Sequence, residues 1–465
     1  MHNHILVIDQ GTHATRAVLF SARGEILDHA EQTISLHRID HAQVEQDAEE
    51  IVNSVLSVVN QIKKLPADTH CALTTQRSTT VAWHKITGAA LCPALSWQDR
   101  RAQQDLDQFE KHTATIKRIT GLPLSAHYGV GKIRWLLAHQ HTVQAAAQQN
   151  NLCIGPLASF LLWRLLDVHP FCVDASNAHR MLLLDLHSNN WSDELLTLFH
   201  IEKKYLPICL PPQHHYGQLR LQQQHNLPLT LACGDQTAAF HGLGPLPEGS
   251  AVVNIGTGAF LLAACDRIIS DTPLLCGVRA GGWLLEGTVN GAGSAIDWAQ
   301  VQWPVADLFD QLPHWLASQT SPPIFINTIG GLGSPWWSDA VPPYFLDEIA
   351  EPAARYVGII ESIVFLLQHN LLALRQQLTI HTLVVSGGLS RLDGLCQKLA
   401  NLTGCVVLRV AQFETTARGA AWLAAGQDPT WFSATPDGQS FHPLTDAGLQ
   451  HRFKQFDDVL HKLCD

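Results

Sequence analysis

The stretch 231–258, LACGDQTAAFHGLGPLPEGSAVVNIGTG, carries the strongest structural signal in the chain. A first apolar run ends at Asp235, before a helix of small residues, and a second apolar run is broken by the Gly-Thr-Gly of residues 256–258. A carboxylate where a strand gives way to a helix can lie at the mouth of a site, and a Gly-Thr-Gly bend can approach a phosphate closely. Taken alone, the stretch fits a capping Asp and an ordinary hairpin turn better, because a lone short motif is a weak signal.

Length and composition exclude several classes of protein. The chain has 465 residues, enough for two or three domains at about 150 residues each. A net charge of −11 argues against a nucleic-acid partner, which needs a basic face. No run approaches ~18 apolar residues and no signal peptide is recognisable, so no membrane partner is expected. The 11 scattered cysteines, without a C-x-x-C pair, indicate reduced thiols and a cytoplasmic location.

The start of the chain predicts a β-meander with a polar corner. Residues 5–8 form a buried-type strand that ends in Asp9-Gln10-Gly11-Thr12, residues 16–20 form a second strand, and a third begins at residues 25–27. Further along, Asp47 and a glutamate three residues later are typical of a helix start, in which the Asp caps the first amides and the Glu reaches back.

Each half of the chain begins in a similar way. The segment ILVIDQGTHATRAVLF (5–20) resembles AVVNIGTGAFLLA (251–263): an apolar strand, a Gly-Thr bend and a second strand. The repeat suggests two related α/β domains that face one another across a cleft. Clefts between domains are common places for small-molecule sites.

Several segments together resemble the FGGY family of carbohydrate kinases, and within it most of all the glycerol kinases. They are DQGTHATRAVLF, VEQDAEEI, TTQRSTTVAWHKITG, LSWQDRR, CGDQTAAF, NIGTGAF, GLGSPWW, ESI, VSGGL and ARGAAWLA, which run in this order from residue 5 to about residue 426. The resemblance implies an α/β fold of two actin-like (ribonuclease-H-like) domains with an interdomain cleft. Residues 1–244 would form the acceptor and magnesium side and residues 245–465 the nucleotide side, with ATP and Mg²⁺ as cofactors.

The resemblance also implies roles for individual residues. Asp235 matches the family's catalytic base, which accepts a proton from the acceptor hydroxyl. Asp9, together with Asp235, matches the magnesium site, although an Asp at this bend could simply cap a turn. The positions that match the nucleotide-binding segments are Gly11, Thr12, Arg16, Gly256, Thr257, Gly258, Gly293, Gly387 and Gly388.

The acceptor site departs from the glycerol kinase pattern. The positions that match the acceptor-binding residues of glycerol kinases are Arg77, Trp97, Asp235, Gln236 and Phe260. The family's glutamate is replaced by Ser78, and its tyrosine by His127, with Tyr128 beside it. Losing a carboxylate removes strong acceptors for hydroxyl groups and leaves space, so an acceptor larger than glycerol is expected. Asp99 resembles the pattern of sugar kinases.

Simpler interpretations of these residues stay open from the sequence. Trp97 and Phe260 could be core aromatics, and Arg77 could belong to a surface ion pair. The expected function is an ATP-dependent kinase that phosphorylates a primary hydroxyl of a small polyol or open-chain sugar. The alternatives are a glycerol kinase proper and, in another class, a non-catalytic protein that senses sugar or nucleotide on a kinase fold. A homodimer is left open.

Overall fold

The computed structural model describes residues 4–220, 227–338, 341–347, 351–410, 414–432 and 438–464. Within these ranges the chain divides into two compact units. The first takes in residues 1–245, 277–283 and 414–434, and the second takes in 246–276, 284–413 and 435–465. The first unit therefore includes two segments from the second half of the chain, which sequence order alone does not indicate. The roles expected for residues 1–244 and 245–465 stay predictions.

A six-stranded sheet in the order β14-β15-β6-β1-β2-β3 forms the centre of the first unit. Its strands are β1 (Ile5–Gln10), β2 (Ala14–Phe20), β3 (Ile26–Thr33), β6 (His70–Thr75), β14 (Gln213–Leu219) and β15 (Leu227–Gly234). The predicted meander is confirmed, since β1 pairs with β2 and β2 with β3, both antiparallel. A second sheet has the order β18-β19-β17-β16-β22-β23-β24. Its strands are β16 (Ser250–Ile255), β17 (Ala259–Cys265), β18 (Leu275–Arg279), β19 (Gly282–Val289), β22 (Thr382–Ser386), β23 (Val406–Val410) and β24 (Gly438–Phe441).

The four central strands of these two sheets share one arrangement, which confirms the predicted duplication. The hairpin β1–β2 corresponds to β16–β17, and both hairpins are antiparallel. Next to the hairpins come parallel pairs, β1–β6 with β6–β15 in one sheet and β16–β22 with β22–β23 in the other. An antiparallel strand, β14 or β24, then closes the edge. The match covers the order and direction of the central strands, so it is stronger than the slight identity between the two sequence segments. The edges differ, because β14 precedes β15 in the chain whereas β24 follows β23, and β18 adds a strand to the second sheet.

Smaller sheets complete the fold. A five-stranded sheet has the order β4-β5-β8-β7-β9. Its strands are β4 (His37–Arg38), β5 (Val44–Gln46), β7 (Thr80–His84), β8 (Ala94–Leu95) and β9 (Leu152–Pro156). The two-stranded pairs are β10 (Cys172–Asp174) with β13 (Ile208–Leu210), β11 (Leu184–Asp185) with β12 (Asn190–Trp191), and β20 (Phe325–Ile326) with β21 (Tyr344–Phe345).

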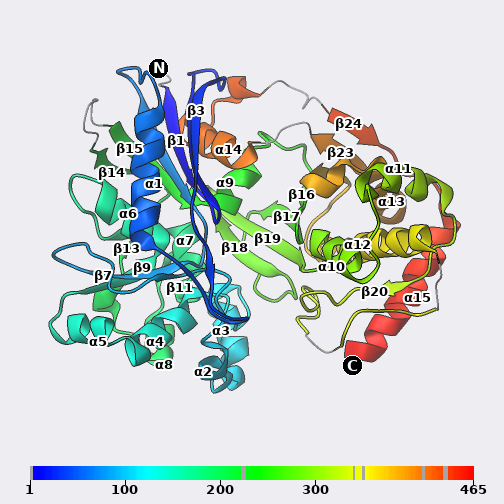
Figure 1. Cartoon of the computed structure of the whole chain (residues 1–465), viewed down its shortest axis with the longest axis horizontal. Coiled ribbons are helices and arrows are strands. Elements are labelled where there is room, and N and C mark those ends of the chain that lie inside the picture. Colours follow the sequence, from blue (N-terminus) through cyan, green and yellow to red (C-terminus); the bar gives the residue numbers. More distant parts are fainter. Residues whose placement is uncertain are drawn as a thin grey trace. The chain divides into compact units, whose positions relative to one another are not determined.

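Helices cover both faces of the first sheet (Figure 1). Alternate residues of β1 point to opposite faces: Leu6 and Ile8 pack with α1 and α6, whereas Ile5 and Val7 pack with α9 and α14. The helices are α1 (Ala48–Gln61), α2 (Gln103–Asp107), α3 (Thr113–Thr120), α4 (Gly129–His139), α5 (His141–Gln148), α6 (Leu157–Leu165), α7 (Ala175–His179), α8 (Asp193–Phe199), α9 (Asp235–His241), α10 (Gly293–Gln302), α11 (Leu308–Ser318), α12 (Pro352–Arg375), α13 (Asp393–Thr403), α14 (Thr415–Ala424) and α15 (Ala447–Cys464).

The start of α1 is only partly as predicted. The side chain of Asp47 caps the helix, because it accepts hydrogen bonds from the amides of Glu49 and Glu50. The Glu50 carboxylate, however, does not reach back to the cap. It accepts hydrogen bonds from the amide and hydroxyl of Ser35, so it ties the helix to the segment after β3 instead.

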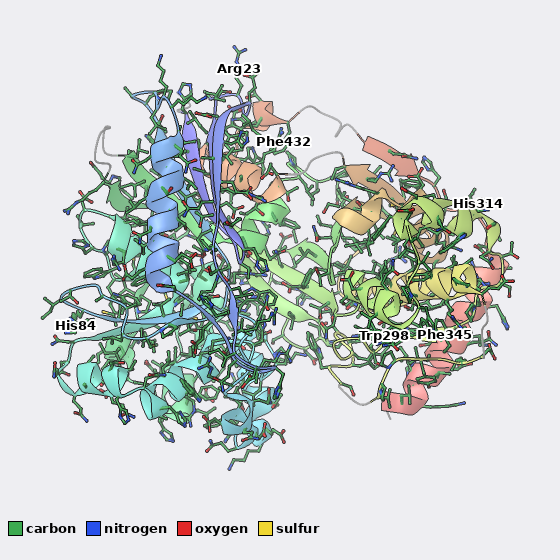
Figure 2. All side chains as sticks on the ribbon, viewed as in Figure 1. Arg23, His84, Trp298, His314, Phe345 and Phe432 are labelled. Atoms are coloured by element: carbon green, nitrogen blue, oxygen red, sulfur yellow. The ribbon has the colours of Figure 1, made fainter. Side chains whose placement is uncertain are left out.

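The second unit is built around the buried helix α12. By length and composition this helix could cross a membrane, but 89% of its most apolar 18-residue window is buried inside the protein, as in the core helix of a folded domain. An aromatic cluster lies in the same unit: Phe325 is 5.6 Å from Trp298 and 4.7 Å from Phe345, measured between ring centroids. Figure 2 labels Trp298 and Phe345.

Candidate active site

Three parallel strands bring the predicted acidic residues to one edge of the first sheet. Asp9 of β1 is paired with Thr74 of β6, and Thr74 is paired with Cys233 of β15. Gly234 is the last residue of β15, and Asp235 begins α9 directly after it. The carboxyl ends of neighbouring parallel strands meet at the same edge, where α/β proteins place their sites. Asp9 and Asp235, 226 residues apart in the sequence, therefore lie close to one another.

Asp9 is a half-buried carboxylate under electrostatic strain. Burial raises the pKa of Asp9 to about 6, the hydrogen bond from Thr74 opposes this rise, and the charge of Asp235 adds to it. Thr74 Oγ1 donates to Asp9 Oδ1 at 2.8 Å. Two carboxylates that repel each other at a partly exposed strand end form a site that a cation would stabilise. This arrangement favours the predicted metal site over a simple turn cap.

Asp235 is held in place by its own helix and by an arginine. It is the first residue of α9, after Gly234 at the cap position, so it is not the capping residue of the simpler interpretation. The amide of Gln236 donates to Asp235 Oδ1 at 2.7 Å, and Arg77 Nε lies 3.6 Å from the same oxygen. A Cβ on Gly234 would come within 2.6 Å of Arg77 Cδ, so a larger residue at position 234 would force the arginine side chain to shift.

The polar corner between β1 and β2 is tied to the predicted acceptor residues. The Gly11 amide donates to the carbonyl of Ala14 at 2.9 Å. Trp97 Nε1 donates to Thr12 Oγ1 at 2.9 Å, so a nucleotide-side residue and an acceptor-side residue of the prediction are in direct contact. Arg16 forms an ion pair with Glu31 at 2.7 Å, and a contact of its guanidinium with nucleotide stays a prediction.

Trp97 and His127 form an aromatic corner beside this loop. Their ring centroids are 5.7 Å apart in an edge-to-face arrangement, and the ring of Tyr128 is 5.2 Å from that of His127. Trp97 and His127 are half-buried, which favours a site wall over a plain core position, whereas Tyr128 is buried. Burial lowers the pKa of His127 well below its ordinary value, and the charge of Lys132 acts in the same direction. The neutral imidazole can then both donate and accept hydrogen bonds.

Ser78 and Asp99 lie deeper than a residue that contacts substrate usually does. Ser78 is fully buried with a φ of 64°, and its hydroxyl donates to the carbonyl of Arg180 at 3.5 Å. Asp99 is also fully buried; Arg101 Nε donates to its carboxylate at 2.9 Å and the Val44 amide donates at 2.8 Å. The geometry gives Asp99 a structural role, and acceptor contacts of these two residues stay predictions.

In the second unit, three glycine-containing turns come together at the ends of β16 and β22. The amides of Gly293 and Ser294, at the start of α10, each donate at 2.9 Å to the carbonyls of Gly256 and Thr257. A Cβ on Gly293 would lie 2.8 Å from the Gly256 oxygen, so glycine is required for this approach. The predicted second phosphate loop and helix start are therefore one connected structure.

The third of these turns follows β22. Gly387 has a φ of 94°, and a Cβ there would come within 2.5 Å of the backbone oxygen of Ile255. A Cβ on the next residue, Gly388, would meet no atom within 4 Å. Gly258 and Phe260 lie on the other side of the hairpin, and Phe260 pairs with Asn254 and is half-buried. The acceptor role of Phe260 stays a prediction.

Some residues that shape the site have no clear signal in the sequence. The buried side chains of Gln10, Gln46 and Gln76 form a hydrogen-bonded network, in which Gln46 Nε2 donates to the Thr12 carbonyl at 2.9 Å. Lys132 of α4 is fully buried and donates to the His127 carbonyl at 2.6 Å, and burial lowers its pKa to about 7. In the sequence, the one hint of these contacts is Lys132 itself, a charged residue at a helical position whose neighbours are apolar.

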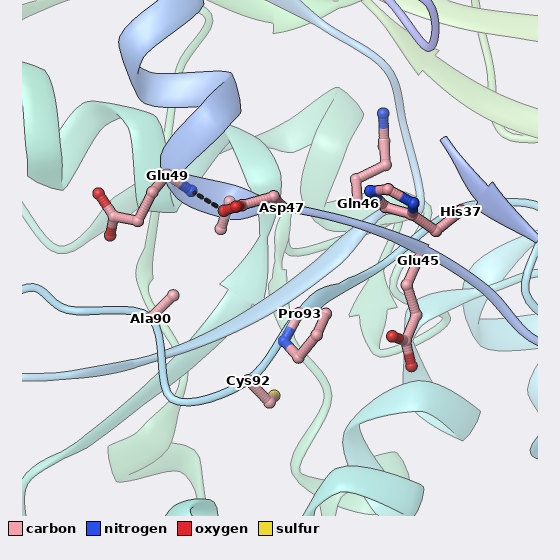
Figure 3. A pocket seen from close by; sticks show the side chains of 9 residues that line it. His37, Glu45, Gln46, Asp47, Glu49, Ala90, Cys92 and Pro93 are labelled. Carbon is pink, nitrogen blue, oxygen red and sulfur yellow. Dashed lines mark hydrogen bonds between the residues drawn. The ribbon is translucent and has the colours of Figure 1, made fainter. Parts of the chain in front are cut away.

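A pocket elsewhere in the first unit is lined by none of the predicted site residues (Figure 3). It has a volume of about 380 Å³ and is lined by residues that include Glu45, Asp47 and Glu49. Its carboxylates already have partners: Glu45 binds Arg101 at 2.7 Å, Glu49 binds Arg164 at 2.9 Å and Asp47 caps α1. The edge of the first sheet is the stronger candidate for an active site.

Comparison with known proteins agrees with this geometry. Residues 4–242 match the N-terminal domain of the FGGY family of carbohydrate kinases, and residues 251–427 match its C-terminal domain. The glycerol kinase of Rhodopirellula baltica is 30% identical over 448 residues, covering 92% of this chain and 83% of that protein. The crystal structure of Plasmodium falciparum glycerol kinase with ADP has a TM-score of 0.90 at 22% identity, covering 100% of this chain and 99% of that one. Gluconate kinase from Lactobacillus acidophilus has a TM-score of 0.88 at 20% identity, covering 100% and 99%.

The chain therefore belongs to the FGGY family of carbohydrate kinases. Its fold is the two-domain actin-like fold of that family, and its activity is ATP-dependent phosphorylation of an alcohol group of a sugar or polyol. Family membership favours the predicted kinase over the alternative of a non-catalytic sensing protein.

Proposed function

We propose that this kinase phosphorylates a primary hydroxyl of a polyol or open-chain sugar larger than glycerol, with Asp235 as the general base. The observation that carries the proposal is the pairing of Asp235 with Arg77 at a parallel strand end, beside the aromatic corner of Trp97 and His127. A base at such a strand end can be reached by the acceptor while its backbone stays fixed.

The residues suit an in-line phosphoryl transfer. Asp235 takes the proton of the acceptor hydroxyl while the acceptor oxygen bonds to the γ-phosphorus and the bond to the ADP oxygen breaks. The Arg77 guanidinium, with Nε 3.6 Å from Asp235 Oδ1, places a positive charge beside the base. The turns at Gly256 and Gly387 would hold the nucleotide through backbone amides. A Cβ on Gly387 would collide with the Ile255 backbone, whereas one on Gly256 would come no closer than 3.8 Å to another atom and would point into space that a phosphate could use.

Asp9 would hold Mg²⁺, with Asp235 as the second acidic residue. In the described part of the chain no group of three or more His, Cys, Asp or Glu side chains could hold a metal alone, so phosphate oxygens would have to complete the shell. This fits magnesium, which commonly keeps one or two carboxylates together with water and substrate phosphates. When bound, the ion would neutralise the charge that develops on the phosphates.

Acceptor size is proposed from two positions. Ser78 replaces a carboxylate, and its short side chain is turned to the Arg180 carbonyl, so a small triol would lose a charged hydrogen-bonding partner there. His127 offers a neutral ring that can bond a further hydroxyl. Glycerol itself is the second candidate, favoured by the 30% identity to a glycerol kinase over most of both chains.

An ATP-consumption screen tests the proposal. The acceptors are glycerol, tetritols, pentitols, ketopentoses and ketohexoses, each with Mg²⁺. We expect the kcat/KM for glycerol to fall at least about tenfold below that of the best acceptor, since a lost charged hydrogen bond costs about 1.5–3 kcal/mol. A comparable value for glycerol would make this a glycerol kinase. The Asp235→Asn variant should lose turnover by orders of magnitude while still binding ATP, and near-normal turnover would refute the role of Asp235.

A further inference from the structure

The buried segment 174–180, DASNAHR, contacts the elements that carry the predicted acceptor side of the site. It includes α7 and the residues on either side of it, and all seven residues are buried. None of them matched a motif in the sequence. Its hydrogen bonds reach the ends of β15 and β6 and the start of α4.

Asp174 fixes the inner part of this segment. One carboxylate oxygen accepts hydrogen bonds from the Ser176 amide at 2.9 Å, from the Asn177 amide at 3.1 Å and from the Ser176 hydroxyl. The other oxygen accepts from Asn177 Nδ2 at 2.7 Å. The side chains of Ser176 and Asn177 thus have one orientation each, because a single buried acid holds both.

The two fixed side chains hold the strand ends next to the reacting groups. The Gly234 amide, immediately before Asp235, donates to Ser176 Oγ at 2.8 Å. The Thr75 hydroxyl, two residues before Arg77, donates to Asn177 Oδ1 at 3.2 Å. Hydrogen bonds therefore connect the end of β15, the end of β6 and one carboxylate.

The last residue of the segment anchors the acceptor-side backbone. The carbonyl of Arg180 accepts from the Gly129 amide at 3.1 Å, directly after Tyr128, and from the Ser78 hydroxyl at 3.5 Å. The segment therefore makes hydrogen bonds close to Gln236, Arg77 and Tyr128, three of the predicted acceptor residues, and to Ser78 itself. None of these bonds involves Trp97.

We propose that Asp174, Ser176 and Asn177 are positioning residues, which set the Asp235 carboxylate against the Arg77 guanidinium for phosphoryl transfer. None of the three needs to touch substrate. The proposal rests on the proposed role of Asp235 as the base. A carboxylate displaced by about 1 Å from the acceptor hydroxyl can cost about a hundredfold in rate.

The test compares Ser176→Ala with Ser192→Ala. Ser192 is a matched control, because its hydroxyl caps α8 in the same unit by accepting from the Leu195 amide, whereas Ser176 Oγ accepts from the Gly234 amide at the end of β15. The measurements are kcat, the KM for ATP and the thermal midpoint. The acceptor is the best one of the screen, with glycerol in parallel.

Ser176→Ala is expected to lower kcat about 10- to 100-fold with the KM for ATP unchanged. Ser176→Thr, which restores a hydroxyl, should recover most of the rate. Ser192→Ala should lower the thermal midpoint but leave kcat and the KM for ATP as they are.

The proposal is overturned if Ser176→Ala lowers the thermal midpoint alone, or if both serine variants change kcat to the same extent. Should Ser176→Ala fail to fold, the near-isosteric Thr75→Val removes only the hydroxyl that binds Asn177. It should lower kcat with the KM for ATP unchanged, and an unchanged kcat would then overturn the proposal. A fully active Asp235→Asn variant would instead refute the proposed function, whatever the serine variants do.

Discussion

Asp9 shows how a functional residue can weaken the fold that carries it. Its carboxylate is half-buried at a strand end, has one hydrogen bond from Thr74 and lies near the charge of Asp235. Burial and this repulsion disfavour the ionised form, which raises the pKa of Asp9 to about 6. Such a residue stays in a protein when function needs the charge.

We therefore predict opposite effects of Asp9→Asn on stability and on activity. In nucleotide-free protein at neutral pH the free energy of unfolding should increase by about 1–3 kcal/mol, and the thermal midpoint should rise with it. The reason is that the substitution removes an ionised carboxylate from a half-buried position, while Thr74 keeps a hydrogen-bond acceptor. Turnover with Mg²⁺ and ATP should fall by at least about a hundredfold. Thermal unfolding and steady-state kinetics measure the two effects.

Asp28→Asn is the control for this prediction. Asp28 lies in β3 of the same sheet, and the hydrogen bond from the Lys63 amide lowers its pKa. Removing this charge should slightly destabilise the protein and leave turnover unchanged. If Asp9→Asn is also destabilising, or if it remains active, then Asp9 is a turn cap and not a metal ligand.

At the scale of elements, the turn between β22 and the following 3₁₀ helix contains two adjacent glycines, Gly387 and Gly388, in different environments. Gly387 needs its positive φ and its lack of a Cβ, because a Cβ would come within 2.5 Å of the Ile255 backbone. Gly388 has no such neighbour. Adjacent glycines of one motif therefore have different physical roles, one in the fold and one in the predicted nucleotide contact.

Gly387→Ala and Gly388→Ala should consequently behave differently. Gly387→Ala should destabilise the protein by roughly 2–4 kcal/mol, from the left-handed backbone and the collision together. Gly388→Ala should change stability by less than about 0.5 kcal/mol but raise the KM for ATP, since the methyl group would occupy the face offered to nucleotide. Chemical unfolding and ATP kinetics distinguish the two. An unchanged KM for ATP in Gly388→Ala would remove this turn from the nucleotide site.

A buried histidine of α12, His369, contacts helix α15. His369 of α12 packs on Phe453, with ring centroids 5.0 Å apart, and its Nε2 lies 3.5 Å from Asp457, which also lies 3.3 Å from the exposed His461. Burial lowers the pKa of His369 to about 4, while the charge of Asp457 raises it and His461 lowers it. The folded protein therefore resists protonation of His369, whereas the unfolded chain takes up a proton near the ordinary pKa of 6.5.

The sign of the pH dependence follows from this difference. Above the ordinary pKa His369 is neutral in both states, and as the pH falls towards about 4 the unfolded state binds the additional proton, so stability is lost. His369→Gln should reduce the loss of thermal midpoint between about pH 7.5 and about pH 5, a range that spans the ordinary histidine pKa. The matched variant His461→Gln, at a 66% exposed side chain, should reduce the loss much less, because burial is the largest cause of the lowered pKa of His369 and the charge of His461 is a lesser one. Equal slopes in all three proteins would contradict the prediction.

For the whole molecule, local sequence patterns predicted individual strands and helices better than the contacts between distant elements. The meander, the Asp47 cap and the strand before Asp235 were predictable because each depends on neighbouring residues. The duplicated topology confirmed a repeat that residue identity shows only weakly, since strand order tolerates changed side chains. Family membership and the kinase activity also followed from ordered motifs.

Long-range pairing was beyond sequence reasoning. The contact between Ser176 and Gly234 depends on the register of β15 and on the direction of a buried hydroxyl, and a serine in a helix looks the same with or without it. Asp99 looked like a substrate residue because it follows Trp97, but its environment includes Arg101 and the distant Val44 amide. Such environments are set by the packing of distant elements and have no local signature.

The tail of the chain provides the last prediction. Helix α15 lies beyond residue 427, where the family match ends, but it belongs to the second unit through a buried ionic cluster. Glu361 of α12 is 1% exposed, and it binds Lys398 of α13 at 2.8 Å and two guanidinium nitrogens of Arg452 of α15 at 2.7 Å. The two cations share this one carboxylate, so its removal leaves buried positive charges without compensation.

Glu361→Gln should therefore destabilise the second unit by about 3–5 kcal/mol, the usual cost of breaking a buried ion pair from one side. The matched variant Asp393→Asn removes the 2.7 Å pair with Arg409, in which the Asp side chain is 63% exposed, and should cost less than about 1 kcal/mol. Urea unfolding measures the stability of both variants, and native-state hydrogen exchange measures the local opening of α15. Exchange in this helix should accelerate only in Glu361→Gln. If exchange in α15 is unaffected, the helix is held by its aromatic contacts with Phe365 and not by the ionic cluster.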